Sequence, residues 1–151
     1  MKIVEAISLI GELKTPVISG DPDTLVYLCL FWLSNLDKEI WQNIISKHEN
    51  TAIEEEYDDE GELITDMPDP TPYEMVEGEG EEPDEIPDVT LIVPEPYSEL
   101  YLHYLAAQID YWNGEITRYN NSMAKYNEKY DDYVALFNRT YMPKQDNYIS
   151  V

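Results

Sequence analysis

Residues 118–143 read RYNNSMAKYNEKYDDYVALFNRTYMP and contain an aromatic ladder at helical spacing. Successive members lie four, three, four, three and four residues apart, which places them on one face of an α-helix. Tyrosine is an unusual core residue, because a buried hydroxyl needs a hydrogen-bond partner or must reach water. We expect the ladder to form the seam of a helical hairpin and part of it to contact a neighbouring subunit, since tyrosine is enriched at protein interfaces. The ladder comprises Tyr119, Met123, Tyr126, Tyr130, Tyr133 and Phe137, and the subunit-packing candidates are Tyr119, Tyr126, Tyr130 and Tyr133.

Helical spacing also characterises the residues before the ladder. Apolar residues recur every three or four positions from Pro96 onward. The Asn113-Gly114 pair then favours a helix end, because both residues tolerate the left-handed backbone that closes a last turn. We therefore expect a helical hairpin in residues 97–140, whose second helix begins near residues 120–122. One unbroken helix of about forty residues is the alternative.

Residues 1–48 predict two further helices. The second starts near Pro22, because the missing N–H of proline costs no hydrogen bond in the first turn of a helix. Asp21 is expected to cap this helix. It contains the nine-residue apolar run LVYLCLFWL at 25–33, which we expect to be the most buried element of the fold. Periodicity leaves open whether this helix is continuous or bends at Ser34-Asn35. The first helix is amphipathic, with an apolar face formed by Ile3, Ala6, Ile7, Ile10 and Leu13.

The segment 49–96 differs in composition from the rest of the chain. Between residues 54 and 95 lie 18 Asp and Glu residues, most of the prolines and three of the six glycines. Such a segment buries too little apolar surface to offset its own ordering entropy. Two short β-prone runs, GELIT and VTLIV, flank its most acidic part. We expect either a two-stranded ribbon with a long acidic tip or an acidic loop that becomes ordered only in an assembly.

Together these segments predict one mostly α domain within the 151 residues. Residues 1–48 and 97–140 are expected to form a small helical bundle that includes the C-terminal hairpin. Residues 49–96 are an acidic loop or short β-ribbon inserted into this bundle. Because proline at position 143 ends the helical pattern, residues 141–151 are expected to form an extended C-terminal arm.

The sequence contains no pattern typical of a catalytic, cofactor or metal site. His48 and His103 lie far apart without partners at metal-ligand spacing, so we expect surface or rim positions for both. Cys29, the only cysteine, falls in the long apolar run and is expected to be a buried, inert thiol. The glycine-containing run EGEGEE would repel a phosphate. We therefore expect no enzymatic activity, no cofactor and no metal.

The charge of the chain bears on its partners. With 32 acidic and 9 basic residues, the formal net charge is −23 and the calculated pI is about 4.1. Binding to nucleic-acid phosphates or to anionic membranes requires the opposite charge, so both are disfavoured. No apolar run exceeds nine residues, which is too short to cross a bilayer. A soluble protein made in the cytoplasm is expected.

Several motifs in the two helical halves are similar to those of one family. The first half contains WLSNLDKEIWQNIISKH, and the second contains, in order, VPEPYSELYLHYL, QIDYWNGE, RYNNSM and NRTYMP. The order of these motifs resembles that of the small head-to-tail connector proteins, also called adaptors, of tailed bacteriophages. The similarity covers residues 25–48 and 93–143, and it lies in structural motifs, which are less specific than a catalytic signature.

This resemblance implies a mostly helical, non-catalytic virion protein. Connectors of this kind form a ring, typically of twelve copies, under the portal protein at the capsid vertex, where they extend the DNA channel and offer the tail or neck protein an attachment surface. In related adaptors the C-terminal segment reaches the portal. DNA is expected to pass along the acidic channel without specific binding. Carried over to this chain, the portal-binding candidates are Asn138, Arg139, Tyr141, Pro143 and Tyr148.

An acidic protein of this size could instead be a DNA mimic. In that alternative its carboxylates would imitate phosphates and occupy a host DNA-binding protein. Such mimicry favours carboxylates arranged along rigid helical faces. Here most of them lie in the Pro- and Gly-containing segment 49–96.

Overall fold

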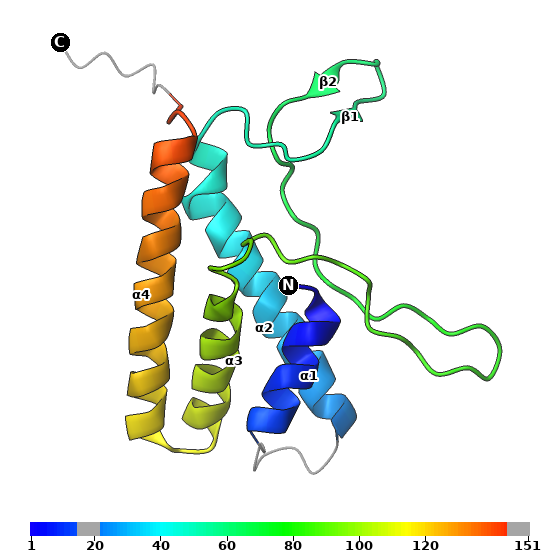
Figure 1. Ribbon diagram of the computed structural model, residues 1–151. Helices are drawn as coiled ribbons and strands as arrows, with labels where there is room; N and C mark the ends of the chain where they lie inside the picture. The colour runs from blue at the N-terminus through cyan, green and yellow to red at the C-terminus, as the bar shows by residue number, and fades with distance from the viewer. Residues whose placement is uncertain (15–21, 145–151) are drawn as a thin grey trace.

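The computed structural model describes residues 1–14 and 22–144, and within them the chain is mostly helical (Figure 1). The expected mostly α class is therefore confirmed. The predicted cap Asp21 lies outside the described residues. The helices are α1 (Ile3–Leu13), α2 (Pro22–Asn43), α3 (Glu99–Trp112) and α4 (Ile116–Thr140), with a 3-10 turn η1 (Ile45–Lys47) after α2; the strands are β1 (Glu56–Tyr57) and β2 (Leu63–Ile64).

Helix α1 has the predicted amphipathic pattern with one exception. Four of the five predicted core residues are buried, but Leu13 is 67% exposed because the helix ends there. At the start of the helix, the Lys2 backbone N–H donates to Oε2 of Glu5 at 3.1 Å, which satisfies one of the free donors of a helix N-terminus. The buried residues are Ile3, Ala6, Ile7 and Ile10.

Helix α2 is continuous from Pro22 to Asn43, without a break at Ser34-Asn35. The expectation that its apolar run is the most buried element was wrong in part. Tyr27 and Phe31 are 55% and 61% exposed, because they line an open groove with residues 70–75 and not the packed core. The opposite side, which includes Leu33, packs into the core.

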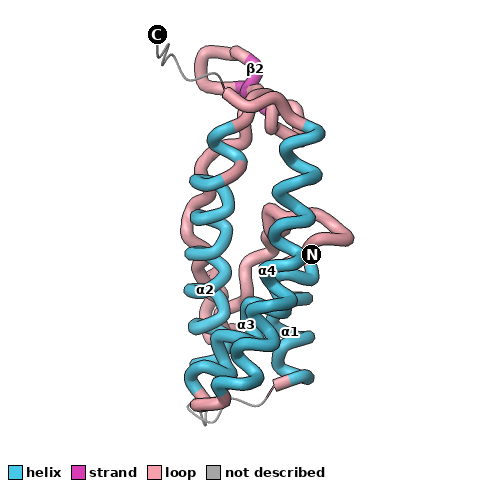
Figure 2. Tube along the Cα trace, turned by 90° about the vertical axis from the view of Figure 1, so that its left-hand side faces the viewer, coloured by secondary structure: helices cyan, strands magenta, loops and turns pink. Residues whose placement is uncertain are grey.

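Two helices, α3 and α4, form within residues 97–140, for which one unbroken helix was the alternative expectation. Gly114 separates the two helices, and its φ of +75° lies in the left-handed region that favours glycine. Helix α4 begins at Ile116, earlier than the predicted start at 120–122. Figure 2 shows the helices along the long axis of the molecule, with β2 and the C-terminal end of the described chain at the same end.

The predicted ribbon between GELIT and VTLIV was wrong. Strand β2 of GELIT pairs with β1, which precedes it across a tight turn, in the register Tyr57 to Leu63. The run VTLIV instead joins the N-terminus: the Ile3 N–H donates to the Val89 carbonyl at 3.0 Å, and the Leu91 N–H donates to the Met1 carbonyl at 3.0 Å. The acidic segment is thus held at several points along the helices.

Cys29 has the predicted buried position. Its side chain is completely inaccessible, and burial raises the pKa of its thiol to about 12. Since the thiolate is the nucleophile, we predict that the native protein resists iodoacetamide at pH 8 and reacts readily in 6 M guanidinium. Mass spectrometry of both samples checks this result. Rapid alkylation of the folded chain would contradict the packing of α2.

Candidate functional site

Three pairs of tyrosine rings join α4 to α3. One ring of each pair lies on α4 and the other on α3 or just before it, and along each side the three tyrosines are seven residues apart. Because the two helices run in opposite directions (Figure 1), rings with this spacing meet at every second turn. All three distances fall in the range of about 4.5–7 Å that favours aromatic pairs. The centroid separations are 6.2 Å for Tyr97–Tyr133, 5.4 Å for Tyr104–Tyr126 and 5.6 Å for Tyr111–Tyr119.

The four subunit-packing candidates divide by burial. Tyr126 and Tyr133 are 9% and 3% exposed, so they pack within the chain, and burial raises the pKa of both hydroxyls. Tyr119 and Tyr130 are half-buried and keep accessible edges on α4. Contact of the ladder with another subunit stays a prediction, and these two residues offer the surface for it.

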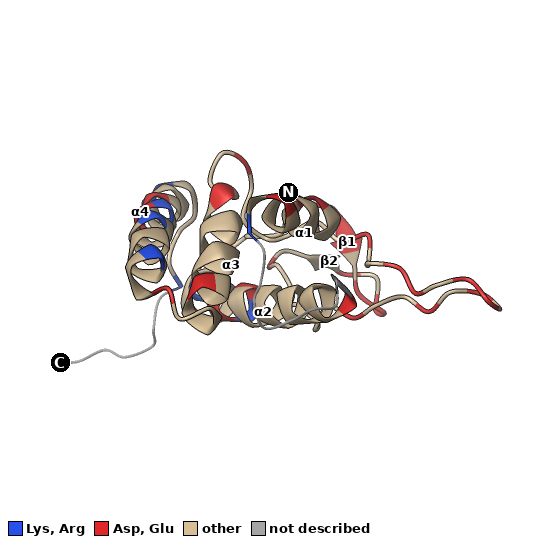
Figure 3. Cartoon of the chain, turned by 90° about the horizontal axis from the view of Figure 1, so that it is seen from below, with Lys and Arg blue, Asp and Glu red and all other residues tan. Residues whose placement is uncertain are grey.

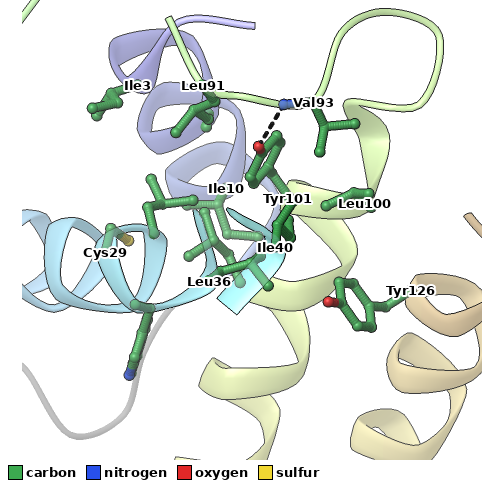
Figure 4. Packing of buried hydrophobic residues seen from close by; sticks show 14 of the residues in the cluster. Ile3, Ile10, Cys29, Leu36, Ile40, Leu91, Val93, Leu100, Tyr101 and Tyr126 are labelled. Carbon is green, nitrogen blue, oxygen red and sulfur yellow. Dashed lines mark hydrogen bonds between the residues drawn. The ribbon is translucent and has the colours of Figure 1, made fainter. Parts of the chain in front are cut away.

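Asp37 forms a polar centre that the sequence reasoning missed. This carboxylate of α2 is fully buried and accepts hydrogen bonds from the Tyr101 hydroxyl at 2.6 Å, from the Tyr73 hydroxyl and from the Ile92 N–H at 3.3 Å. Tyr101 in turn accepts a hydrogen bond from the Val93 N–H at 2.9 Å (Figure 4). Burial raises the pKa of Asp37, although the hydrogen bonds act in the opposite direction. The centre fastens two distant parts of the acidic segment to α2 and α3.

The C-terminal end of α4 packs on the end of α2. His48 is buried, which corrects its predicted surface or rim position: its Nδ1 donates to the Ile44 carbonyl at 2.7 Å, and its Nε2 lies 2.8 Å from Oδ1 of Asn138. The edge of the His48 ring meets Phe137, with centroids 4.9 Å apart, and Tyr141 covers the same phenyl ring at 4.4 Å. Periodicity missed His48 because it follows the last helical turn.

The residues after α4 continue this contact. Pro143 and His48 form an antiparallel bridge, the Glu49 N–H donates to the Met142 carbonyl at 2.8 Å, and the Lys144 N–H donates to the Lys47 carbonyl at 2.7 Å. The first part of the predicted arm is therefore paired with the chain itself.

The five portal-binding candidates are thus in different situations. Asn138 and Pro143 contact His48, and Tyr141 packs on the neighbouring Phe137 ring. Arg139 is exposed and has no salt bridge to any described residue. Tyr148 lies outside the described residues.

Charge is unevenly distributed over the molecule. Residues 49–96 carry 19 of the 32 acidic residues and none of the 9 basic ones. Figure 3 shows acidic positions along the loops at one side and a group of basic positions on α4 at the other. Among the described residues, four salt bridges attach the acidic segment to the rest of the chain: the Met1 amino group–Glu95 at 3.7 Å, Lys2–Asp88 at 2.8 Å, Lys144–Asp66 at 3.4 Å and Lys38–Asp69.

Over residues 1–14 and 22–144, no group of three His, Cys, Asp or Glu side chains is arranged to hold a metal ion. None of the helices in these ranges has the length and apolar character needed to cross a bilayer.

The chain matches no protein-family model, and comparisons with curated proteins and with solved structures find no match.

Proposed function

We propose that this chain is a subunit of a head-to-tail connector ring in a tailed bacteriophage. In this proposal the helices form a small bundle with a C-terminal hairpin, about twelve copies surround the DNA channel as the resemblance implies, and the C-terminal arm 141–151 binds the portal. The distal face receives the tail or neck protein. The virion is then the site of function, and the host cytoplasm the site of synthesis.

The observation that carries the proposal is the position of the connector-like motifs in the fold. VPEPYSELYLHYL leads into and begins α3, QIDYWNGE covers its end and the turn, and NRTYMP covers the end of α4 and its contact with the residues after α2. The motifs therefore coincide with the boundaries of one continuous structural unit. Such agreement is expected if they specify a shared architecture.

The distribution of charge also supports the proposal. A ring of subunits, each with a net charge of −23, would repel DNA along its channel, so the genome would slide past without adhering. The same charge keeps free subunits apart. Ring closure is therefore expected to require the portal as a template and to strengthen with salt, which screens repulsion beyond a Debye length of about 8 Å at physiological ionic strength.

The arm gives a direct test of the proposal. A chain that ends at Lys144 keeps its hydrogen bond to Lys47, so we predict a wild-type melting temperature but loss of co-sedimentation with purified portal. A matched variant replaces residues 145–151 with a Gly-Ser tail of equal length and separates the role of the sequence from that of chain length. Negative-stain images of the portal with the wild-type chain should show an added ring.

Two results would contradict this reading. Wild-type attachment by the truncated chain would remove the arm from the proposal. Retention of the full chain by DNA-binding enzymes, combined with no binding to portal, would favour the DNA mimic instead.

A further inference from the structure

The turn between α3 and α4 contains the dipeptide Asn113-Gly114, the only Asn-Gly pair in the sequence. Gly114 has φ +75°, a conformation that residues with a side chain rarely adopt, so the turn requires glycine at this position. The missing side chain also leaves the Gly114 nitrogen unhindered for attack on the side-chain amide of the residue before it. The conformation of the turn therefore places a chemically reactive pair at the end of α3.

The folded turn keeps the two reacting atoms, the Gly114 nitrogen and Cγ of Asn113, apart. Asn113 has ψ −4°, so the Gly114 nitrogen is eclipsed by the backbone nitrogen of Asn113. Ring closure requires it to lie close to Cβ instead, and rotation about ψ is the only soft motion that brings it there, because the peptide bond is planar. This rotation breaks the hydrogen bond from the Gly114 N–H to the Tyr111 carbonyl, which measures 3.1 Å. The turn must therefore open before the two atoms can react.

A buried carboxylate, Asp110, braces this turn. Its backbone carbonyl accepts a hydrogen bond from the Glu115 N–H at 2.9 Å, and its side chain is fully buried. Lys14, just after α1, donates to both carboxylate oxygens at 2.9 and 3.2 Å, and the Ser122 hydroxyl of α4 donates to Oδ2 at 3.4 Å. Removing one partner of a buried ion pair leaves the other charge uncompensated, which is strongly destabilising. Opening of the turn is therefore expected to depend on Lys14.

We propose that Asn113 is a deamidation site that reacts when the α3–α4 turn opens. The Gly114 nitrogen attacks Cγ of Asn113, and the new C–N bond closes a five-membered cyclic imide. The bond between Cγ and the side-chain nitrogen breaks, that nitrogen takes up the Gly114 proton through water, and ammonia leaves. Water then adds to one of the two imide carbonyls and opens the ring, which leaves an aspartyl or an isoaspartyl residue at position 113.

The product changes the end of α3 in two ways. Both forms add a carboxylate at the C-terminal end of the helix, where the helix dipole favours positive charge. In the isoaspartyl form the backbone also runs through the former side chain, so the turn is longer by one carbon atom. Both changes favour opening of the turn, and the reaction adds one negative charge to a chain whose net charge is −23. Because the reaction occurs within a single chain, it does not depend on the proposed function.

The rates of the reaction in the folded and the unfolded chain give the first test. The full chain is incubated at pH 8 in buffer and in 6 M guanidinium, and peptide mass spectrometry measures the conversion of the Asn113 amide to an acid over time. We expect conversion at least about tenfold slower in the folded chain, because the closed turn protects the pair. Equal rates in the two samples would overturn the proposal, and so would an unfolded chain in which Asn113 does not react.

Variants at the two ends of the hairpin distinguish opening of the turn from unfolding of the chain. Lys14→Gln removes the brace of Asp110 and is expected to raise the folded-state rate at Asn113 at least about tenfold. Phe137→Ala weakens the packing at the far end of α4 and is expected to raise this rate less than about threefold. Circular dichroism melts establish that both variants are folded in the assay. Equal increases in the two variants, or no increase for Lys14→Gln, would overturn the proposal.

The wild-type chain gives the same distinction without any substitution. Opening of one turn exposes little surface, so urea below the unfolding transition should change the rate at Asn113 by less than about twofold. Global unfolding exposes the whole core, and a rate controlled by it would rise steeply over the same urea range. A steep rise would therefore overturn the proposal even if a variant failed to fold.

Discussion

Asp37→Ala is expected to lower the free energy of unfolding by about 3 kcal/mol, since each buried donor left without an acceptor costs about 1–3 kcal/mol. Three donors lose their acceptor: the hydroxyls of Tyr101 and Tyr73 and the N–H of Ile92. The substitution also removes the cost of burying the Asp37 carboxylate, and this offsets part of the loss. Urea unfolding followed by circular dichroism measures the difference.

The control for this substitution is Glu39→Ala, two residues further along α2 at an exposed position. A surface substitution of this kind should change stability by no more than about 0.5 kcal/mol. A loss below about 1 kcal/mol for Asp37→Ala would mean that the three donors find water or other acceptors. In that case Asp37 would not be the fastening point of the acidic segment.

The Asp37→Asn variant adds a pH test. Because the pKa of Asp37 is raised in the folded chain, the folded state holds the proton more tightly than the unfolded state does. The stability gained in this way is fully present below the unfolded value of 3.8 and is lost as pH rises through the folded pKa. The stability of the wild type minus that of Asp37→Asn should therefore fall as pH rises above 3.8. A constant or rising difference would contradict the raised pKa.

Phe137→Ala is expected to cost about 3–5 kcal/mol, the usual loss for a buried aromatic residue cut back to alanine. Phe137 is 6% exposed and touches the rings of His48, Tyr133 and Tyr141. Its removal leaves a cavity where the end of α4 meets the end of α2. We also expect faster hydrogen exchange of the Lys144 amide, whose partner is the Lys47 carbonyl.

The chain contains a matched control for this prediction. Phe31, the other phenylalanine, is 61% exposed, so Phe31→Ala makes the same chemical change outside the core. Its expected cost is below about 1 kcal/mol. Equal losses for the two variants in thermal or urea unfolding would contradict the packing described for the end of α4.

Local periodicity predicted the helices well, because the apolar spacing of a helix is contained in neighbouring residues. The pattern at Ile3, Ile7 and Ile10 predicted the buried face of α1, and the tyrosine ladder predicted the buried face of α4. The tyrosine pairs could also have been predicted. The spacing of seven residues in Tyr97, Tyr104 and Tyr111 matches that in Tyr119, Tyr126 and Tyr133, and antiparallel helices bring such repeats together.

The acidic segment was harder to predict, since its order depends on contacts distant in sequence. Asp37 meets Tyr73 and Ile92 across 36 and 55 residues, which no local pattern reports. The ribbon was misassigned for a different reason. Closing a short turn costs less entropy than closing a long loop, and Asp58 and Gly61 supply that turn: the Gly61 N–H donates to the Asp58 carbonyl at 3.0 Å, and Gly61 has φ +81°.

The paired tyrosines have a mechanical consequence. If α4 slid along α3, three tyrosine rings would have to pass their partner rings at the same time. The next register that pairs tyrosines lies two helical turns away, and it would leave one ring unpaired at each end. This arrangement keeps the register of the two helices fixed along the hairpin axis. A hairpin held in register in this way transmits a force along its axis from one helix to the other.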